Sequence, residues 1–458
     1  ARLYQESEGL PLLLVAYLDA WLSQTIPATS DASAEEMWRL PSNVRDLFRL
    51  RLGALDNLAA QFIAAAAVIG RSFDFETLLA ASGRSEQETI TGIESLLSYG
   101  VIEECDACDS PEQIRYDFTH EKLRSLAYEQ ISLTRRRLLH RRVAEALVEQ
   151  ARRAGDAGRL ASQIAHHYQL CGQKSLAAAY FRQAGDYSRG LFANRQALEH
   201  YRSAQALGYP EQLEIEEACG DLHVLLGEYT QALETYRRVG QNASAKDIPR
   251  LAYKQGNVEQ RRGRWGAAME QYRFALATDA HPQPAFIARV KADWSFAAYQ
   301  SGQEDDATEL AQQSLANAQY AGDPQALAQA NNLLGILARK RGEYRLSRSH
   351  LEKSLALGQQ MKADEMQAAA LNNLALLESD LGNLDAAIDY TKMALEICQR
   401  LGDRHRVAAL HNNLADFYQH HEQPELAIHH LTQAILIFTE IGGDAEAMQP
   451  EIWKLTEW

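Results

Sequence analysis

The sequence predicts a mainly α-helical protein in which a small module of helices and one strand hairpin precedes a long solenoid of helical pairs. From about residue 135 onward the chain is rich in Ala, Leu and Gln and has almost no β-branched runs, which favours helix. The same region repeats a pattern centred on glycine every 36–40 residues, and such a period indicates stacked supersecondary units. A chain of 458 residues can form two or three structural units.

Bulk composition narrows the classes of function. The formal charge of −15 argues against nucleic acid as the main ligand, because phosphate binding needs an electropositive face. Five scattered cysteines do not form a disulfide framework, and no apolar stretch is long enough to span a bilayer. We therefore expect a cytoplasmic location. Because the chain starts with Ala1 inside a helical pattern, we also expect a piece of a longer protein.

The first 133 residues are expected to hold two segments. Residues 1–36 read as a helical segment, and residues 37–133 read as helices followed by a two-stranded hairpin. Helices followed by a hairpin is the order of a winged helix, so a winged-helix-like domain is predicted here. The expected elements are helices at 42–55, 59–69, 75–81 and 85–99, and strands at 101–104 and 114–118.

A winged helix raises the question of DNA binding. The positions of the 85–99 helix expected to be exposed are Glu86, Glu88, Thr89, Thr91 and Glu94. The carboxylates among them would repel phosphates, so we do not expect this helix to bind DNA. The basic run at 134–137 opens a helical connector with degenerate repeats at 134–210, and its arginines are read as a solvated face.

Six registers of one pattern define the solenoid at 211–445. A small residue follows each turn position by five residues, and another small or slim residue follows it by twelve. Glycine suits the turn because it adopts positive φ without a Cβ penalty, while small side chains let two helices approach closely. The turn positions are Gly227, Gly263, Gly302, Gly342, Gly382 and Glu422. This pattern resembles tetratricopeptide repeats (TPR) of the longer, roughly 40-residue kind.

The last repeat departs from the others. Glu422 and Pro424 replace the usual glycine and aromatic residue, which fits a terminal, capping repeat. We expect residues 446–458 to supply a final helix that caps the open end.

An amide ladder marks the expected inner face of the solenoid. Asn332, Asn372 and Asn412 are 40 residues apart, and the TPR resemblance implies that this helical position faces a groove and contacts peptide main chain. An amide offers both a donor and an acceptor, which matches an extended backbone. The alternative is that these residues bond neighbouring helices inside the array, as is expected of Asn373 and Asn413. Further candidates for the groove by helical spacing are Arg289, Arg339, Lys340, Asp416 and His420.

The order of the pieces also resembles the back half of signal-transducing STAND ATPases, which place an NTPase before a winged helix and a repeat sensor. Gly9-Leu10-Pro11 resembles their Gly-x-Pro motif, whose proline packs near the adenine. The segment from Phe118 to Arg124 resembles the one whose histidine contacts the ADP phosphate, which implies that His120 holds a closed, ADP-bound state. The alternative is that His120 closes the hairpin onto a helix.

No catalytic machinery is evident. The sequence contains no Gly-x-x-x-x-Gly-Lys-Ser/Thr motif, so it lacks the loop and lysine that cradle phosphates. The pair Cys105 and Cys108 has zinc-ligand spacing but no second pair, and no metal site is expected. We therefore expect no enzyme activity, no catalytic residue and no cofactor in this chain. The STAND resemblance implies ATP or ADP and Mg²⁺ in the parent protein.

Three functional hypotheses remain. The first is the sensor region of a bacterial-type signalling ATPase, whose repeats bind a protein or peptide and whose winged helix relays occupancy to an upstream NTPase. The second is a constitutive scaffold, and the third is a transcription regulator that contacts DNA through the basic connector. No membrane partner is expected.

Overall fold

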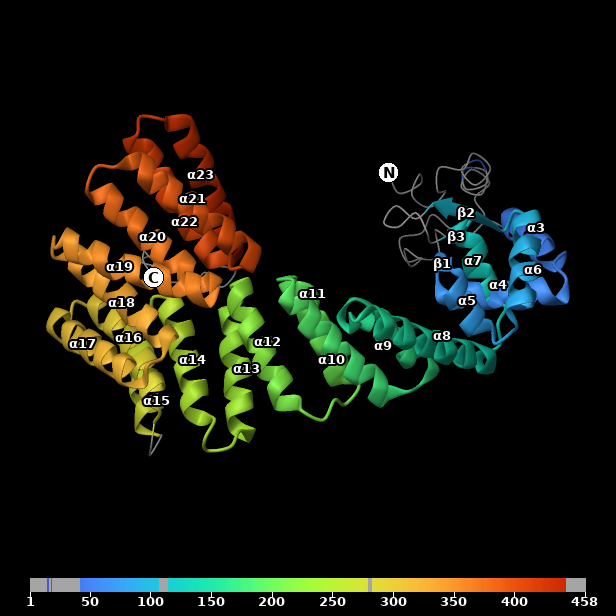
Figure 1. Ribbon diagram of the computed structural model, residues 1–458, viewed down its shortest axis with the longest axis horizontal. Coiled ribbons are helices and arrows are strands. Elements are labelled where there is room, and N and C mark those ends of the chain that lie inside the picture. Colours follow the sequence, from blue (N-terminus) through green and yellow to red (C-terminus); the bar gives the residue numbers. More distant parts are fainter. Residues whose placement is uncertain (1–14, 16–17, 19–41, 107–113, 279–281, 442–458) are drawn as a thin grey trace. The chain divides into compact units, whose positions relative to one another are not determined.

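The computed structural model describes residues 15, 18, 42–106, 114–278 and 282–441 (Figure 1). These residues are mostly helical and form two compact units. The first unit runs to Ala184 and includes Ala206–Tyr209, and the second comprises Gly185–Gln205 and the chain from Pro210 onward. No helix among the described residues is long and apolar enough to cross a membrane.

Helices surround a small antiparallel sheet in the first unit. The sheet has the order β1-β3-β2, so β3 is central and pairs with both neighbours. The elements are α3 (Ser42–Gly53), α4 (Asn57–Ile69), β1 (Ser72–Asp74), α5 (Phe75–Ser82), α6 (Glu86–Ser98), β2 (Ile102–Asp106), β3 (Ile114–Phe118), α7 (Glu121–Glu129), α8 (Leu133–Ala154), α9 (Ala157–Cys171) and the start of α10 (Lys174–Gly190).

Two features of this unit differ from the sequence-based expectation. The sheet has three strands rather than two, because the short segment after α4 pairs with β3 through Phe73 and Tyr116. Three residues are too few to show an alternating pattern in the sequence. Thr89, expected to be exposed, is fully buried in α6, where its hydroxyl donates to the carbonyl of Ser85. Glu86 and Glu94 are exposed as expected.

Helical pairs fill the second unit, and Figure 1 shows them stacked in chain order. From α12 to α23 every helix contacts the next helix along the chain, both within a pair and between pairs, which is the arrangement of a solenoid. The helices are α11 (Asn194–Ala206), α12 (Gln212–Leu226), α13 (Tyr229–Asn242), α14 (Ile248–Arg261), α15 (Trp265–Ala277), α16 (Pro284–Gln300), α17 (Glu304–Ala321), α18 (Pro324–Lys340), α19 (Tyr344–Met361), α20 (Asp364–Asp380), α21 (Leu384–Leu401), α22 (Arg404–His420) and α23 (Pro424–Ile441).

The predicted turn positions all adopt the left-handed backbone conformation. The five glycines have φ between 72° and 81°, and Glu422 reaches φ 59° despite its Cβ. Phe192 also has φ 58° and precedes Gly227 by 35 residues, so it begins a seventh register within the segment expected to hold degenerate repeats. Each repeat therefore has a left-handed residue at its turn. Glycine adopts this conformation most easily, but Phe and Glu also occupy the position.

A second glycine position, seven residues before the turn, controls how closely the two helices of a pair approach. A Cβ built on Gly256 would lie 2.5 Å from Cε1 of Tyr272, which is fully buried in the second helix of that pair. The same contact joins Gly220 to Tyr236. In these repeats the tyrosine ring of the second helix fills the space that a side chain at the glycine would occupy. The ring therefore packs directly against the backbone of the first helix, and the two helices lie close together.

Candidate functional site

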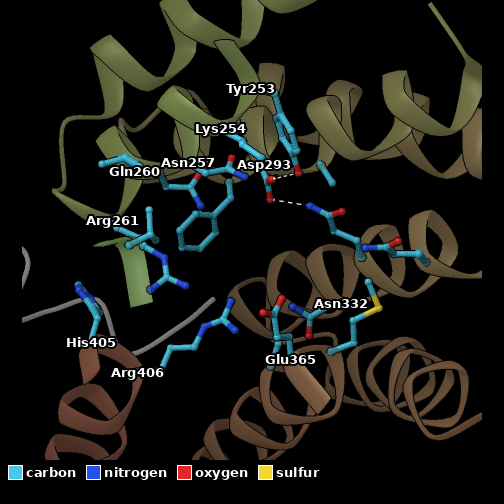
Figure 2. Close-up of a pocket in the computed structure, with 18 of the residues that line it drawn as sticks. Tyr253, Lys254, Asn257, Gln260, Arg261, Asp293, Asn332, Glu365, His405 and Arg406 are labelled. Atoms are coloured by element: carbon cyan, nitrogen blue, oxygen red, sulfur yellow. Dashed lines mark hydrogen bonds between the residues drawn. The ribbon is translucent and has the colours of Figure 1, made fainter. Parts of the chain in front are cut away.

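A pocket of about 470 Å³ lies inside the second unit (Figure 2). It is lined mainly by the first helices of successive pairs, α12, α14, α16 and α18, together with the starts of α20 and α22. A cleft of this size is in the range that holds small ligands, about 300–1,000 Å³. Five amide side chains line it: Asn257, Gln260, Gln325, Gln329 and Asn332.

One carboxylate of the pocket is held by neutral groups. Asp293 of α16 accepts hydrogen bonds from the hydroxyl of Tyr253 at 2.6 Å and from Nε2 of Gln329 at 2.7 Å, as Figure 2 shows. Burial raises the pKa of Asp293, and these two hydrogen bonds together with the charges of Arg406 and Arg289 offset only part of that effect. No lysine, arginine or histidine in the described parts of the chain forms an ion pair with Asp293 within 4.0 Å.

A second acidic residue of the pocket lining, Asp221, is ion-paired. Asp221 of α12 accepts from Nζ of Lys254 at 2.6 Å and from the Tyr236 hydroxyl at 2.8 Å, and Arg189 lies 3.3 Å away. Lys254 also contacts Glu217 at 2.7 Å. Burial lowers the pKa of Lys254, but Asp221 favours its charged form. This cluster therefore neutralises its own charges.

The superhelix closes on itself beside the pocket through three contacts, which together we name the clasp. Arg261 of α14 donates two hydrogen bonds to Asp403, at 3.0 and 2.8 Å, although 142 residues separate them. The Tyr229 hydroxyl and Nδ1 of His405 share a hydrogen bond of 2.7 Å. The Asn194 amide donates to the Leu401 carbonyl at 2.9 Å. The clasp thus joins the early repeats of this unit to the start of α22.

Charge and burial oppose one another in the clasp. Burial alone would raise the pKa of Asp403, but the charges of Arg261 and Arg406 outweigh it and hold this pKa well below its usual range. Burial and the nearby Arg261 lower the pKa of His405 to about 3, so the ring is neutral at physiological pH. Asp403 also caps α22 by accepting from the Arg406 amide.

The asparagines predicted to face the groove divide between two environments. Asn332 lines the pocket and is 9% exposed, and its Oδ1 accepts from Asn373 at 3.0 Å. Asn372 is fully buried and its Oδ1 accepts from Asn413 at 2.9 Å, so its expected place in the groove is wrong. Asn412 is half-buried and lies outside the pocket lining. These amides mainly connect neighbouring repeats, because a polar group between packed helices needs a partner.

The charged residues expected in the groove do not line the pocket. Arg339 is buried and donates to Asp380 at 2.8 Å, linking α18 to α20, so it is an interhelical residue. Arg289 is half-buried on α16, and Lys340 is exposed at the end of α18. Asp416 and His420 are exposed and form a pair 3.5 Å apart on α22. Helical spacing alone could not separate the inner face from the faces between pairs.

The residues matched to the STAND motifs lie in the first unit or outside the described residues. Gly9 and Pro11 fall outside the described part of the chain. His120 precedes α7 and its ring centroid lies 5.8 Å from that of Phe48 in α3. This contact agrees with the alternative reading, in which His120 joins the end of the hairpin to a helix.

Most of the residues that line the pocket were not predicted from the sequence. Tyr253, Lys254 and Asp293 occupy helical positions next to or equal to that of Asn332 in earlier repeats, yet they are of different residue types. Aligning the turn residues and reading the same positions in every repeat would have found them. A search for identical amides 40 residues apart could not.

Comparisons with known proteins agree with the fold. Residues 366–440 match the family model of the tetratricopeptide repeat. Among solved structures, the Rap conjugation gene regulator of the plasmid pLS20, in complex with a peptide, is 14% identical, with a TM-score of 0.50, 86% of this chain and 98% of that chain covered. This likeness shows a shared fold of TPR type. The search of curated proteins found no match.

Two further solved structures are similar at lower scores. A STAND protein with a tetratricopeptide repeat sensor from Pyrococcus horikoshii is 12% identical, with a TM-score of 0.45, covering 99% of this chain and 67% of that chain. A Rap protein complexed with competence and sporulation factor is 16% identical, with a TM-score of 0.47, covering 71% and 93%. The repeated helical pairs, the matched family model and the likeness to the pLS20 regulator define a TPR-type helical repeat protein.

Proposed function

We propose that the second unit binds a peptide segment of a protein partner in the pocket on its inner helices. The main support for this proposal is the set of side chains that line the pocket. Five amide side chains lie there beside apolar ones such as Phe296, Leu333 and Ile336. Amides match the alternating donors and acceptors of a peptide backbone, while apolar walls take its side chains. The likeness to a Rap regulator solved with a peptide supports the same function.

A photocrosslinker placed in the pocket tests this proposal. Met366 lines the pocket, whereas Tyr320 lies outside its lining and is 85% exposed on α17. Each is replaced in turn by benzoylphenylalanine, and the protein is irradiated in lysate of its host. We expect one defined protein adduct from position 366 and none from position 320. Equal labelling from both positions, or from neither, would contradict binding in the pocket.

We further propose that the bound state is relayed to an upstream NTPase in the parent protein, with the first unit as a winged-helix relay. A ligand that prefers one conformation shifts the equilibrium by its differential affinity alone. The clasp supports this proposal, because closing the superhelix couples α14 to α22 across the pocket. By resemblance, Gly9, Pro11 and His120 would contact the nucleotide there.

Nucleotide dependence separates this relay from a constitutive scaffold. In the NTPase-containing protein, partner affinity is measured with ADP and with ATP, for the natural chain and for His120→Ala. A relay predicts different affinities in the two nucleotides and a smaller difference in the variant. A scaffold predicts one affinity throughout. Retardation of duplex DNA at low salt would instead favour the DNA-binding alternative.

A further inference from the structure

The charged side chains that line the pocket differ in whether they have an oppositely charged partner. Among the described residues that line it, Arg189 and Lys254 pair with Asp221, and Arg261 pairs with Asp403. Arg406, which also lines the pocket, lies 3.7 Å from Asp403, so each of these cations has a carboxylate partner. Among the described acidic residues of the lining, Asp293 and the exposed Glu365 form no ion pair within 4.0 Å, and Asp293 is the less exposed of the two. Asp293 accepts hydrogen bonds from the neutral donors Tyr253 and Gln329, and the charges of Arg406 and Arg289 act on it without forming an ion pair within 4.0 Å.

Two hydrogen bonds hold the Asp293 carboxylate in a fixed orientation at the wall of the pocket. Tyr253 and Gln329 come from α14 and α18, on either side of α16, and each holds a different oxygen of Asp293. Each carboxylate oxygen can accept a second hydrogen bond. Figure 2 shows Asp293 with its partners at one side of the pocket and His405 and Arg406 at the other. The fixed carboxylate therefore offers a preorganised acceptor for a ligand.

A neutral ligand would be penalised at this point. Filling the pocket removes water from Asp293, and a charged group that loses water without gaining an opposite charge is strongly disfavoured. A ligand cation would supply that charge and use the vacant acceptor positions of both oxygens. An anionic ligand would meet arginine and lysine side chains that are already paired, and would be repelled by Asp293.

We propose that the pocket selects peptides carrying a cationic side chain, lysine or arginine, and that Asp293 binds that cation while Tyr253 and Gln329 hold the carboxylate in place. This specificity rests on the proposed peptide binding and names the chemistry of the ligand. A pocket of about 470 Å³ accommodates a few residues of an extended peptide, so the cationic side chain must lie within a short segment of the ligand.

A random library of hexapeptides, acetylated at the amino end and amidated at the carboxyl end, provides the probe. The whole chain is immobilised as the natural protein, as Asp293→Asn and as the control Asp416→Asn, whose carboxylate is exposed outside the pocket lining. Retained peptides are sequenced by mass spectrometry, and thermal melting verifies the fold of each variant. We expect Lys and Arg to be enriched by the natural protein and by the control, and not by Asp293→Asn.

A second measurement uses the natural protein alone, so the test does not depend on how well Asp293→Asn folds. For an enriched peptide, replacing its arginine by the isosteric neutral citrulline is expected to weaken binding about tenfold or more. Peptides retained without enrichment of Lys or Arg, or with equal affinity for the citrulline form, would overturn the cation specificity and leave peptide binding intact. Retention of no peptide would overturn both proposals.

Discussion

The clasp gives the sharpest prediction about stability. Asp403 is 2% exposed and its partner Arg261 is 21% exposed, so the pair is held largely away from water. Asn at position 403 is expected to retain the cap on α22, because Asn and Asp cap helices about equally well. Asp403→Asn therefore removes mainly the ion pair and leaves Arg261 buried without its carboxylate. We expect a loss of about 3–5 kcal/mol in the free energy of unfolding of the second unit.

A matched pair at the surface provides the control. Arg400 and Asp364 lie 2.7 Å apart but are 50% and 29% exposed, so Asp364→Asn should cost about 0–1 kcal/mol. Urea unfolding measures both changes, and hydrogen exchange locates them. Asp403→Asn should lower protection in α12, α14 and α22 while leaving α18 and α19 protected. Equal destabilisation by the two substitutions would refute the argument that burial makes this pair strong.

Three further predictions concern the turns, the helix contacts and the response to acid. Glu422→Gly should stabilise the protein by about 0.5–1 kcal/mol in urea unfolding, and Glu422→Ala should not, because only glycine relieves a left-handed backbone. Gly256→Ala should cost about 1–3 kcal/mol because its Cβ would meet Tyr272, whereas Gly266→Ala, with nothing within 4 Å, should be neutral or stabilising; equal effects would contradict this reasoning. Burial lowers the pKa of His405 to about 3, so this residue should contribute a loss of stability of about 1.4 kcal/mol per pH unit as the pH falls below 6.5. His405→Gln should therefore make the melting temperature less dependent on pH between 6.5 and 4.5, and an unchanged dependence would contradict this reasoning.

Much of the second unit was predictable from the sequence because its determinants are local. Glycine at the turn and small residues five and twelve positions later specify a helical hairpin, and the repetition of this pattern specifies stacking. The seventh register was expected only as a degenerate repeat, because Phe192 stands at its turn position in place of glycine and adopts the same backbone conformation. The third strand of the first unit was missed because three residues carry no period.

The candidate site depends on contacts that no local pattern encodes. Arg261 meets Asp403 only because small rotations between successive pairs add up to closure of the superhelix, and these rotations arise from packing across every interface. The same packing places Asn332 beside the pocket and buries Asn372, although both occupy one position of the repeat. The sequence by itself determined the helical pairs and their order. Only the tertiary structure decided which side chains surround the pocket and leave Asp293 with neutral partners, because burial and pairing depend on the whole array.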